Sequence, residues 1–227
     1  MEIEAEYNTV NISGLEIQFR KWKVKDKTLL DQIDLDTSLS PLEKSLKKRQ
    51  VFVYNCLKNP VHLDIEQYNY VLSLIREFSL HNDLEFSLEC EKCKHQFLRT
   101  FKTPEIVQFK DSDYKEVDIR GMKIKFGNIQ DSNYDRDILN SISSSERYLL
   151  DLVYHIEELN GKKVTVEEAL DLFQELDVDV FQELFDAFCD QRASCSFSKT
   201  ITCPECGQEL HFEFENISSF FPKSWNI

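Results

Sequence analysis

The chain has 227 residues and a formal net charge of −14, from 27 Lys and Arg against 41 Asp and Glu. This balance disfavours binding to a phosphate backbone, which needs a concentrated basic surface. The sequence lacks an apolar run of about 18 residues that could span a membrane, and its acidic start does not have the pattern of a signal peptide. We therefore expect a protein made and kept in a reducing cytoplasm, where cysteines serve as metal ligands more readily than as disulfides.

The first elements combine a strand pattern with a short helix. Residues 10–24 place apolar side chains at alternate positions on both sides of a turn at Ser13-Gly14. This alternation predicts a two-stranded element with one buried face. Apolar residues at helical spacing then predict a short helix over 25–33.

A second helix is predicted to begin at Ser40. Serine can cap a helix, Pro41 suits its first turn, and Glu43 completes a capping box, so the helix should run from here to about residue 58. It carries one basic run, Lys44, Lys47, Lys48 and Arg49. We interpret this run as a solvated helix face rather than a nucleic-acid site.

Asp64 is predicted to cap the next helix, which has a continuous apolar face. That face consists of Ile65, Tyr68, Leu72, Ile75 and Phe78. Arg76 lies beside it, and we expect its stem to pack while its charged head stays in water. Alternating patterns predict further strands around 106–109 and 117–126.

A mainly helical stretch is predicted from residue 135. Ser143 and Thr165 each precede a glutamate at capping-box spacing, Gly161 is a plausible C-cap, and a third helix starts near Val178. This last helix carries Phe181, Leu184, Phe185 and Phe188. The phenylalanines could form a partner-binding stripe, but their helical spacing is more typical of a core.

Four of the seven cysteines form two Cys-x-x-Cys pairs, Cys90 with Cys93 and Cys203 with Cys206. Together they offer four soft ligands, which suits one tetrahedral structural zinc ion. The flanks repeat with the cysteines, pairing Leu88 with Ile201, Phe97 with Leu210 and Phe101 with Phe214. The pairs are therefore interpreted as two copies of one half-site, each with the order strand, turn, strand. A long insertion separates the two copies, which is acceptable because the entropic cost of closing a loop grows only slowly with its length.

Other roles for the cysteine pairs remain open. They could hold two separate metals, form redox disulfides in a thiol enzyme, or lie unliganded in a core. The redox reading is disfavoured because strand patterns follow both pairs, whereas an activating helix would lower the thiol pKa. Gly207 suits a left-handed turn, and Lys94 takes the equivalent place in the first pair. His95 and His211 lie close enough in sequence to act as substitute ligands.

The three remaining cysteines and the C-terminal aromatics lie outside these motifs. Cys56 and Cys189 fall on apolar helical faces and are predicted to be small core residues, while Cys195 is ambiguous. The last eight residues contain three aromatic side chains, Phe220, Phe221 and Trp225. They either dock onto the core or bind a partner, and we predict partner binding because exposed aromatics serve well as interface anchors.

The order of these motifs resembles the baseplate hub assembly proteins of T-even-type contractile-tailed phages. The resemblance rests on residues 14–25, 64–68, 74–79 and 165–168, both cysteine pairs, and the closing Phe220-Phe221. It covers nearly the whole chain. The order of the motifs supports it, rather than any single motif.

The resemblance implies a non-enzymatic protein that builds the central hub of the baseplate, either in the virion or as an assembly factor. Its expected partners are other baseplate hub or tail proteins, without a membrane, a small-molecule substrate or a nucleic acid. It would act in the host cytoplasm during assembly or in the virion tail baseplate, with zinc in a structural role. The alternative is a zinc-ribbon nucleic-acid-binding accessory factor. For such a role the two Cys-x-x-Cys turns, which we call the first and second knuckle, and their flanks offer few basic side chains, mainly Lys92, Lys94, His95 and Arg99.

The sequence thus predicts an α+β fold with small antiparallel β elements and a split four-cysteine zinc ribbon that carries a mainly helical insertion. Four regions are expected: an N-terminal hairpin and helical region over 1–88, the first knuckle with strands over 89–134, the helical insertion over 135–195, and the second knuckle with the aromatic tail over 196–227.

Overall fold

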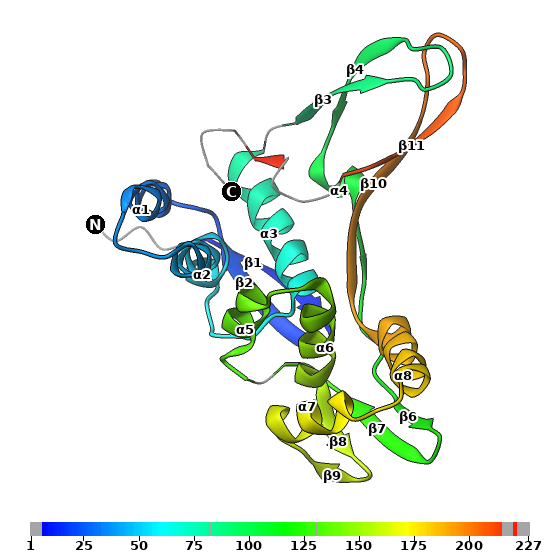
Figure 1. The fold of residues 1–227 in the computed structure, drawn as a ribbon. Helices are drawn as coiled ribbons and strands as arrows, with labels where there is room; N and C mark the ends of the chain where they lie inside the picture. Colours follow the sequence, from blue (N-terminus) through cyan, green and yellow to red (C-terminus); the bar gives the residue numbers. More distant parts are fainter. Residues whose placement is uncertain (1–5, 82, 130, 215–219, 222–227) are drawn as a thin grey trace.

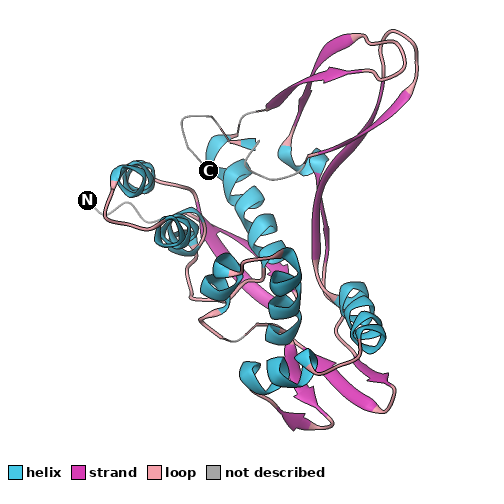
Figure 2. Ribbon diagram, in the orientation of Figure 1, coloured by secondary structure: helices cyan, strands magenta, loops and turns pink. Residues whose placement is uncertain are grey.

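The structure is a computed structural model of the chain that describes residues 6–81, 83–129, 131–214 and 220–221 (Figure 1). Helices and short antiparallel strand pairs alternate along it (Figure 2), which confirms the predicted α+β class with small antiparallel sheets. No described helix combines the length and hydropathy needed to cross a membrane.

A hairpin and three helices form the N-terminal part of the molecule. They are β1 (Tyr7–Ile12), β2 (Leu15–Arg20), α1 (Val24–Leu35), α2 (Pro41–Phe52), the 3-10 turn η1 (Tyr54–Cys56) and α3 (Ile65–Leu80). Ser13 and Gly14 form the predicted turn, both with the positive φ angles of a two-residue hairpin loop. The strand pattern ends at Arg20 rather than at residue 24, because Val24 already opens α1.

Side-chain caps start α2 and α3 where the sequence predicts. The Ser40 side chain accepts a hydrogen bond from the backbone N–H of Glu43, and Asp64 accepts one from Gln67, in reciprocal capping boxes. The end of α2 was predicted wrongly: the backbone leaves the helical conformation at Val53, well before residue 58.

The first hydrophobic core lies between the hairpin, α2 and α3. Its fully buried side chains include Ile12, Val53, Cys56, Val71 and Ile75, and Phe220 and Phe221 from the C-terminal end also pack into it. The predictions for Cys56 and for the apolar face of α3 are therefore confirmed.

The prediction that the charged head of Arg76 on α3 stays in water is wrong, because the head is buried. The residue is only 1 % exposed. Its Nε donates to the backbone oxygen of Phe220 at 2.7 Å, and its Nη1 donates to Thr103 Oγ1 at 2.9 Å. Arg76 thus ties the C-terminal end of the described chain to α3.

A second core lies between a four-stranded antiparallel sheet and three helices. The sheet order is β6 (Glu116–Ile119), β7 (Met122–Phe126), β8 (Ile156–Leu159) and β9 (Lys162–Lys163), and the helices are α6 (Ser144–Tyr154), α7 (Val166–Gln174) and α8 (Val178–Gln191). A smaller cluster joins α5 (Tyr134–Asn140) to α6. Ser143 and Thr165 cap α6 and α7 as predicted. Gly161 is not a helix C-cap but lies in the turn between β8 and β9, where its φ is 75°.

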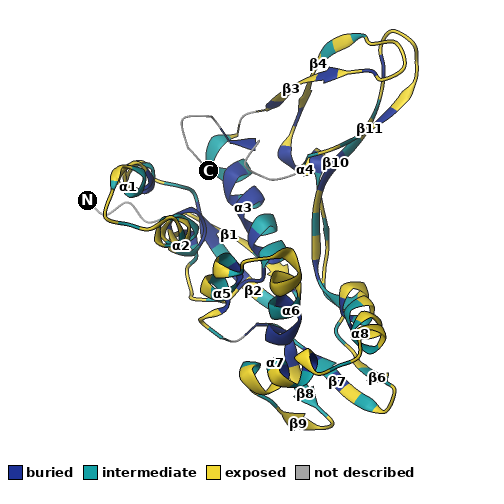
Figure 3. Cartoon of the chain, in the orientation of Figure 1, coloured by how far each residue is buried: buried dark blue, intermediate teal, exposed yellow. Residues whose placement is uncertain are grey.

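An arm of strands extends from the first core. It contains β3 (Leu84–Glu89), β4 (Gln96–Phe101), the short α4 (Thr103–Ile106), β5 (Val107–Lys110), β10 (Ser194–Thr202) and β11 (Glu209–Glu213). The first half of β10 pairs with β5 and its second half pairs with β11. The hairpins β3–β4 and β10–β11 project together from the helical body, and much of their surface is exposed (Figures 1 and 3).

A buried ionic cluster joins the two cores. Asp64 and Glu66 come from the start of α3, Asp151 and His155 from the end of α6, and Arg192 follows α8. Arg192 bridges Asp151 and Glu66, and the His155 Nε2 lies 3.5 Å from Asp64 Oδ2. Because each charge has an opposite partner, the cluster can remain buried between the cores.

Candidate metal centre

The two cysteine pairs lie at the tips of two hairpins with the same architecture. In the first hairpin Leu88 of β3 pairs with Phe97 of β4. In the second, Ile201 of β10 pairs with Leu210 of β11. These are the positions that the sequence alignment of the two half-sites equates, so their predicted strand, turn and strand form is confirmed.

Both turns use the same backbone hydrogen bonds. The N–H of Cys90 donates to the His95 carbonyl at 3.0 Å, and the N–H of Lys94 donates to the Cys90 carbonyl at 2.8 Å. The second turn repeats both bonds, from Cys203 to Gln208 at 2.8 Å and from Gly207 to Cys203 at 3.0 Å. Each turn therefore presents its two cysteine side chains in the same way.

The left-handed position of each turn is filled by a different residue. Gly207 has a φ of 70°, as its sequence position predicts, and Lys94 has a φ of 60°. A side chain makes this conformation costly, and glycine adopts it freely. The first turn consequently keeps the knuckle geometry at a conformational cost that the second avoids.

The four sulfur atoms converge on one point between the hairpins. Cys90 Sγ lies 3.7 Å from Cys206 Sγ, Cys93 Sγ lies 3.7 Å from Cys203 Sγ, and all four sulfurs lie within 4.8 Å of one another. With a Zn–S bond of about 2.3 Å, the sulfurs of a regular tetrahedron are about 3.8 Å apart. The spacing and the soft donor set therefore fit one four-coordinate zinc ion.

The surroundings favour a thiolate at Cys90. Backbone N–H groups of Cys93 and Lys92, together with the thiols of Cys93 and Cys206, lower the pKa of Cys90 to about 7. The thiolate is the form that binds metal. The first cysteine of each pair is buried and the second is exposed, so the hairpins contribute equivalent ligands.

The two histidines near the pairs are not part of this group. The set of metal-ligating side chains that converge in the described chain consists of the four cysteines. The His95 ring stacks on Phe97, and His211 contacts Thr200 and Glu213 instead. Four cysteines already complete a tetrahedral shell.

The remaining cysteines differ in their environments. Cys189 is exposed, so its predicted core role is wrong: Leu184 and Phe188 form the buried face of α8, and Cys189 falls outside it. Cys195 is half-buried in β10, and its N–H donates to Glu66 at 2.9 Å.

Of the C-terminal aromatics, Phe220 and Phe221 dock onto the core of the described chain. Phe220 is 1 % exposed and contacts Phe197 with ring centroids 5.1 Å apart, and Phe221 contacts Trp22 at 5.5 Å. Trp225 lies outside the described residues. Partner binding by this segment stays a prediction.

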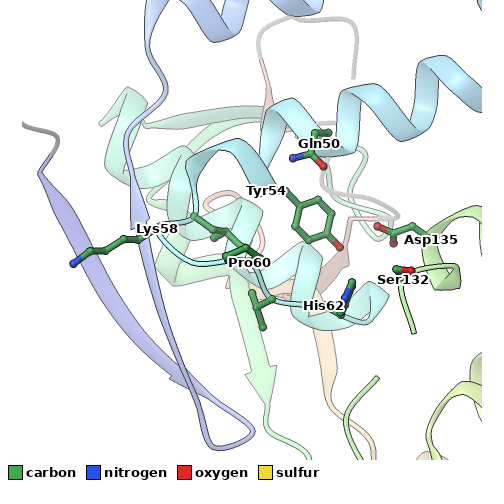
Figure 4. A pocket seen from close by; sticks show the side chains of 9 residues that line it. Gln50, Tyr54, Lys58, Pro60, His62, Ser132 and Asp135 are labelled. Carbon is green, nitrogen blue, oxygen red and sulfur yellow. The ribbon is translucent and has the colours of Figure 1, made fainter. Parts of the chain in front are cut away.

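A separate pocket of about 370 Å³ lies between the end of α2 and the segment before α5 (Figure 4). Its lining includes His62, Ser132 and Asp135. Among the described residues, neither His62 nor Ser132 hydrogen-bonds to Asp135, whose carboxylate accepts from Arg49 at 2.7 Å. Arg49 also stacks over Tyr68, so this end of the basic run on α2 packs inside the fold.

Sequence reasoning missed the buried ionic cluster and the contacts of Arg76. The residues concerned are far apart in the chain, and each follows an ordinary local pattern, such as a cap or a helix end. Their buried state is set by the packing of α3 against α6 and β10, for which no local signal exists.

Comparison with known proteins identifies the family of the chain. Searches of curated proteins and of solved structures find no significant similarity. A family model described as T4 bacteriophage base plate protein matches residues 3–222. The match confirms the predicted relationship to T4-type baseplate proteins, and it spans both cysteine knuckles and both cores. The chain therefore belongs to the T4 bacteriophage base plate protein family.

Proposed function

We propose that this chain is a non-enzymatic scaffold of the central hub of the phage baseplate, as a hub protein or as a hub assembly factor, and that one structural zinc ion stabilises it. Membership of a base plate family supports a structural role in the phage tail and interaction with other tail proteins. The hub location, the action in the host cytoplasm during assembly and the zinc are the parts that go beyond the family. The division into regions at residues 88, 134 and 195 is likewise part of the proposal.

The convergence of four sulfurs from two distant hairpins carries the proposal. Cys90 and Cys206 are separated by 116 positions in sequence, yet their sulfurs lie 3.7 Å apart. Zinc at this point would join the two ends of a split ribbon and fix the projecting arm. Structural zinc supplies roughly 10–16 kcal/mol of apparent binding free energy, which is comparable with the net stability of about 5–15 kcal/mol of a whole domain.

The arm is suited to contact partners because its surface is exposed and its base is buried in the first core. Leu98 on β4 is exposed, while Leu88 and Phe101 anchor the hairpin in the first core. Tail or hub proteins would contact the outer surface of the arm. Partner contact at the C-terminal end is proposed for Phe220, Phe221 and Trp225, of which Phe220 and Phe221 are buried in the first core within this chain.

Genetic complementation tests this function directly. A phage that lacks this gene should produce lysates without complete baseplates in electron micrographs, and plasmid-borne wild-type protein should restore them. The double variant Cys203→Ser, Cys206→Ser should fail to restore them, whereas Cys189→Ser, at an exposed cysteine away from the centre, should succeed. Normal baseplates in the deletion lysate would refute the proposed role, and restoration by the double variant would refute the structural role of zinc.

A further inference from the structure

The outer edge of β11 is a free strand edge at the tip of the arm. Within the described chain β11 is the terminal strand of its sheet, with β10 on its inner side. Gln208 and Phe214, which bracket β11, make backbone hydrogen bonds toward that inner side. Because backbone groups of successive strand residues point to opposite sides, those of Glu209, His211 and Glu213 face outward. The Glu209 carbonyl accepts from the exposed Gln208 side chain at 3.0 Å, a contact that an added strand can replace.

A groove of about 590 Å³ follows this edge. One side of it is formed by Glu89 at the end of β3 and by Glu91 and Lys92 of the first knuckle, and the other side by Gln208 and residues 209–212. Consecutive side chains of a strand lie on opposite faces of the sheet. A groove that touches all of residues 209–212 therefore runs along the edge of β11 rather than over one of its faces. An extended segment can enter such a groove and pair its backbone with the strand.

The groove and its surroundings carry an excess of negative charge. Residues 89–94 and 205–213 contain five Glu against two Lys, and no Asp or Arg. Lys94 lies 3.6 Å from Glu89, and Lys92 is the second cation, so three carboxylates remain in excess. This balance selects a segment with basic side chains. It also disfavours a nucleic acid, whose phosphates carry the same sign of charge.

The first hairpin offers an internal comparison for the β11 edge. The alignment that equates Cys90 with Cys203 also equates the outward positions 209, 211 and 213 with three uncharged residues of β4, which are Gln96, Leu98 and Thr100. The edge of β4 thus repeats the backbone arrangement without the carboxylates. The two edges allow pairing through the backbone alone to be separated from pairing that charge selects.

We propose that the outer edge of β11 binds an extended segment of another baseplate protein as an added strand, and that basic and apolar residues alternate along this segment. Side chains on one face of the added strand meet Glu209 and Glu213, and those on the other face continue the apolar surface of Leu210 and Phe212. Basic residues at every second position satisfy both faces. This inference rests on the proposed scaffold role, since it names the chemistry of one partner.

Fluorescence anisotropy with a labelled synthetic peptide of four Lys-Val repeats tests the pairing on the full-length protein. The wild-type protein should bind this peptide, and binding should weaken as the salt concentration rises. A peptide of four lysines followed by four valines has the same composition without the alternation. It should bind at least about tenfold more weakly.

Two proline variants test whether the β11 edge is the site. His211→Pro removes an outward N–H donor without removing a hydrogen bond to β10, and it should abolish binding. Leu98→Pro makes the same change at the equivalent outward position of β4 and should bind like the wild type.

Two charge-reversal variants test the selection by charge. Glu209→Lys with Glu213→Lys should weaken binding at least about tenfold. Asp171→Lys with Glu175→Lys reverses two exposed carboxylates at the end of α7, far from the groove in sequence, and should bind like the wild type. Equal weakening in both variants would show attraction to the acidic protein as a whole and would overturn the proposal.

The other outcomes also decide the matter. A wild-type protein that does not bind, equal binding of the two peptides, or equal loss in both proline variants would overturn the proposal. Self-association of the wild type that His211→Pro abolishes would assign the edge to a second copy instead. Circular dichroism and zinc content show whether each variant is folded, and if a proline variant is not, the charge-reversal pair decides. Baseplate complementation tests the scaffold role separately, so a failed groove is distinguishable from a failed function.

Discussion

Replacing Phe220 with alanine tests whether the C-terminal end is part of the fold. Phe220 is 1 % exposed, and its ring lies within 6.2 Å of those of Phe197, Phe214 and Phe86, measured between centroids. Truncating such a buried phenylalanine removes apolar burial and leaves a cavity, which costs about 3–5 kcal/mol. In a domain of this size, about 2–4 °C of melting temperature is lost per kcal/mol. We therefore expect Phe220→Ala to lower the melting temperature of the first core by about 6–20 °C.

Tryptophan fluorescence during urea and thermal unfolding provides the assay. Trp22 packs on Phe52 and Phe221, so its emission reports on the first core. Leu98→Ala, at an exposed apolar residue on β4, is the matched control and should change the unfolding free energy by less than about 0.5 kcal/mol. If Phe220→Ala were as mild as this control, the docked position of the C-terminal end would be wrong and an anchoring role toward a partner would be favoured.

Two further predictions concern the buried histidine and the knuckle turns. Burial opposes the charged form of His155, but the hydrogen bond to Asp64 and the charge of Asp151 raise its pKa above the usual 6.5. Its stabilising contribution is therefore complete below the unfolded pKa and is lost as the pH rises through the folded pKa, with a slope of at most about 1.4 kcal/mol per pH unit. In urea unfolding from pH 6 to 9, His155→Gln should flatten this loss and the exposed His62→Gln should not; the same slope in both variants would contradict the assignment. At the turns, Lys94→Gly should stabilise the zinc-loaded protein by about 0.5–1 kcal/mol, and Gly207→Lys should destabilise it by about 1 kcal/mol. A Cβ at Gly207 would meet no atom within 4 Å, so the second cost is conformational alone, and shifts of equal sign in the two variants would refute the shared turn geometry.

Local chemistry made much of the fold predictable from the sequence. Ser40, Asp64 and Thr165 cap helices where their spacing to a glutamate or glutamine places the cap. The repeated flanks of the cysteine pairs predicted two equivalent hairpins, because apolar alternation fixes which residues pair across each turn. The Cys-x-x-Cys spacing also predicted that the four sulfurs converge, because two such pairs together complete one tetrahedral zinc site.

The errors arose where packing between distant segments decides the outcome. Gly161 has the sequence context of a helix C-cap, but β7 draws the preceding residues into a strand, and the glycine turns that strand into β9. Cys189 follows the buried Phe188 on α8, and only the orientation of the helix against the sheet places it in solvent. Arg76 is buried because Phe220, 144 positions away, supplies a carbonyl acceptor.

Metal content is the most direct test of the zinc-stabilised arm. Elemental analysis of the purified wild-type protein should find one zinc ion per chain. Either double variant, Cys90→Ser with Cys93→Ser or Cys203→Ser with Cys206→Ser, should contain none, because each removes half of one tetrahedral shell. A wild-type protein without zinc, or a double variant that still holds a stoichiometric ion, would contradict a single site shared by the two hairpins.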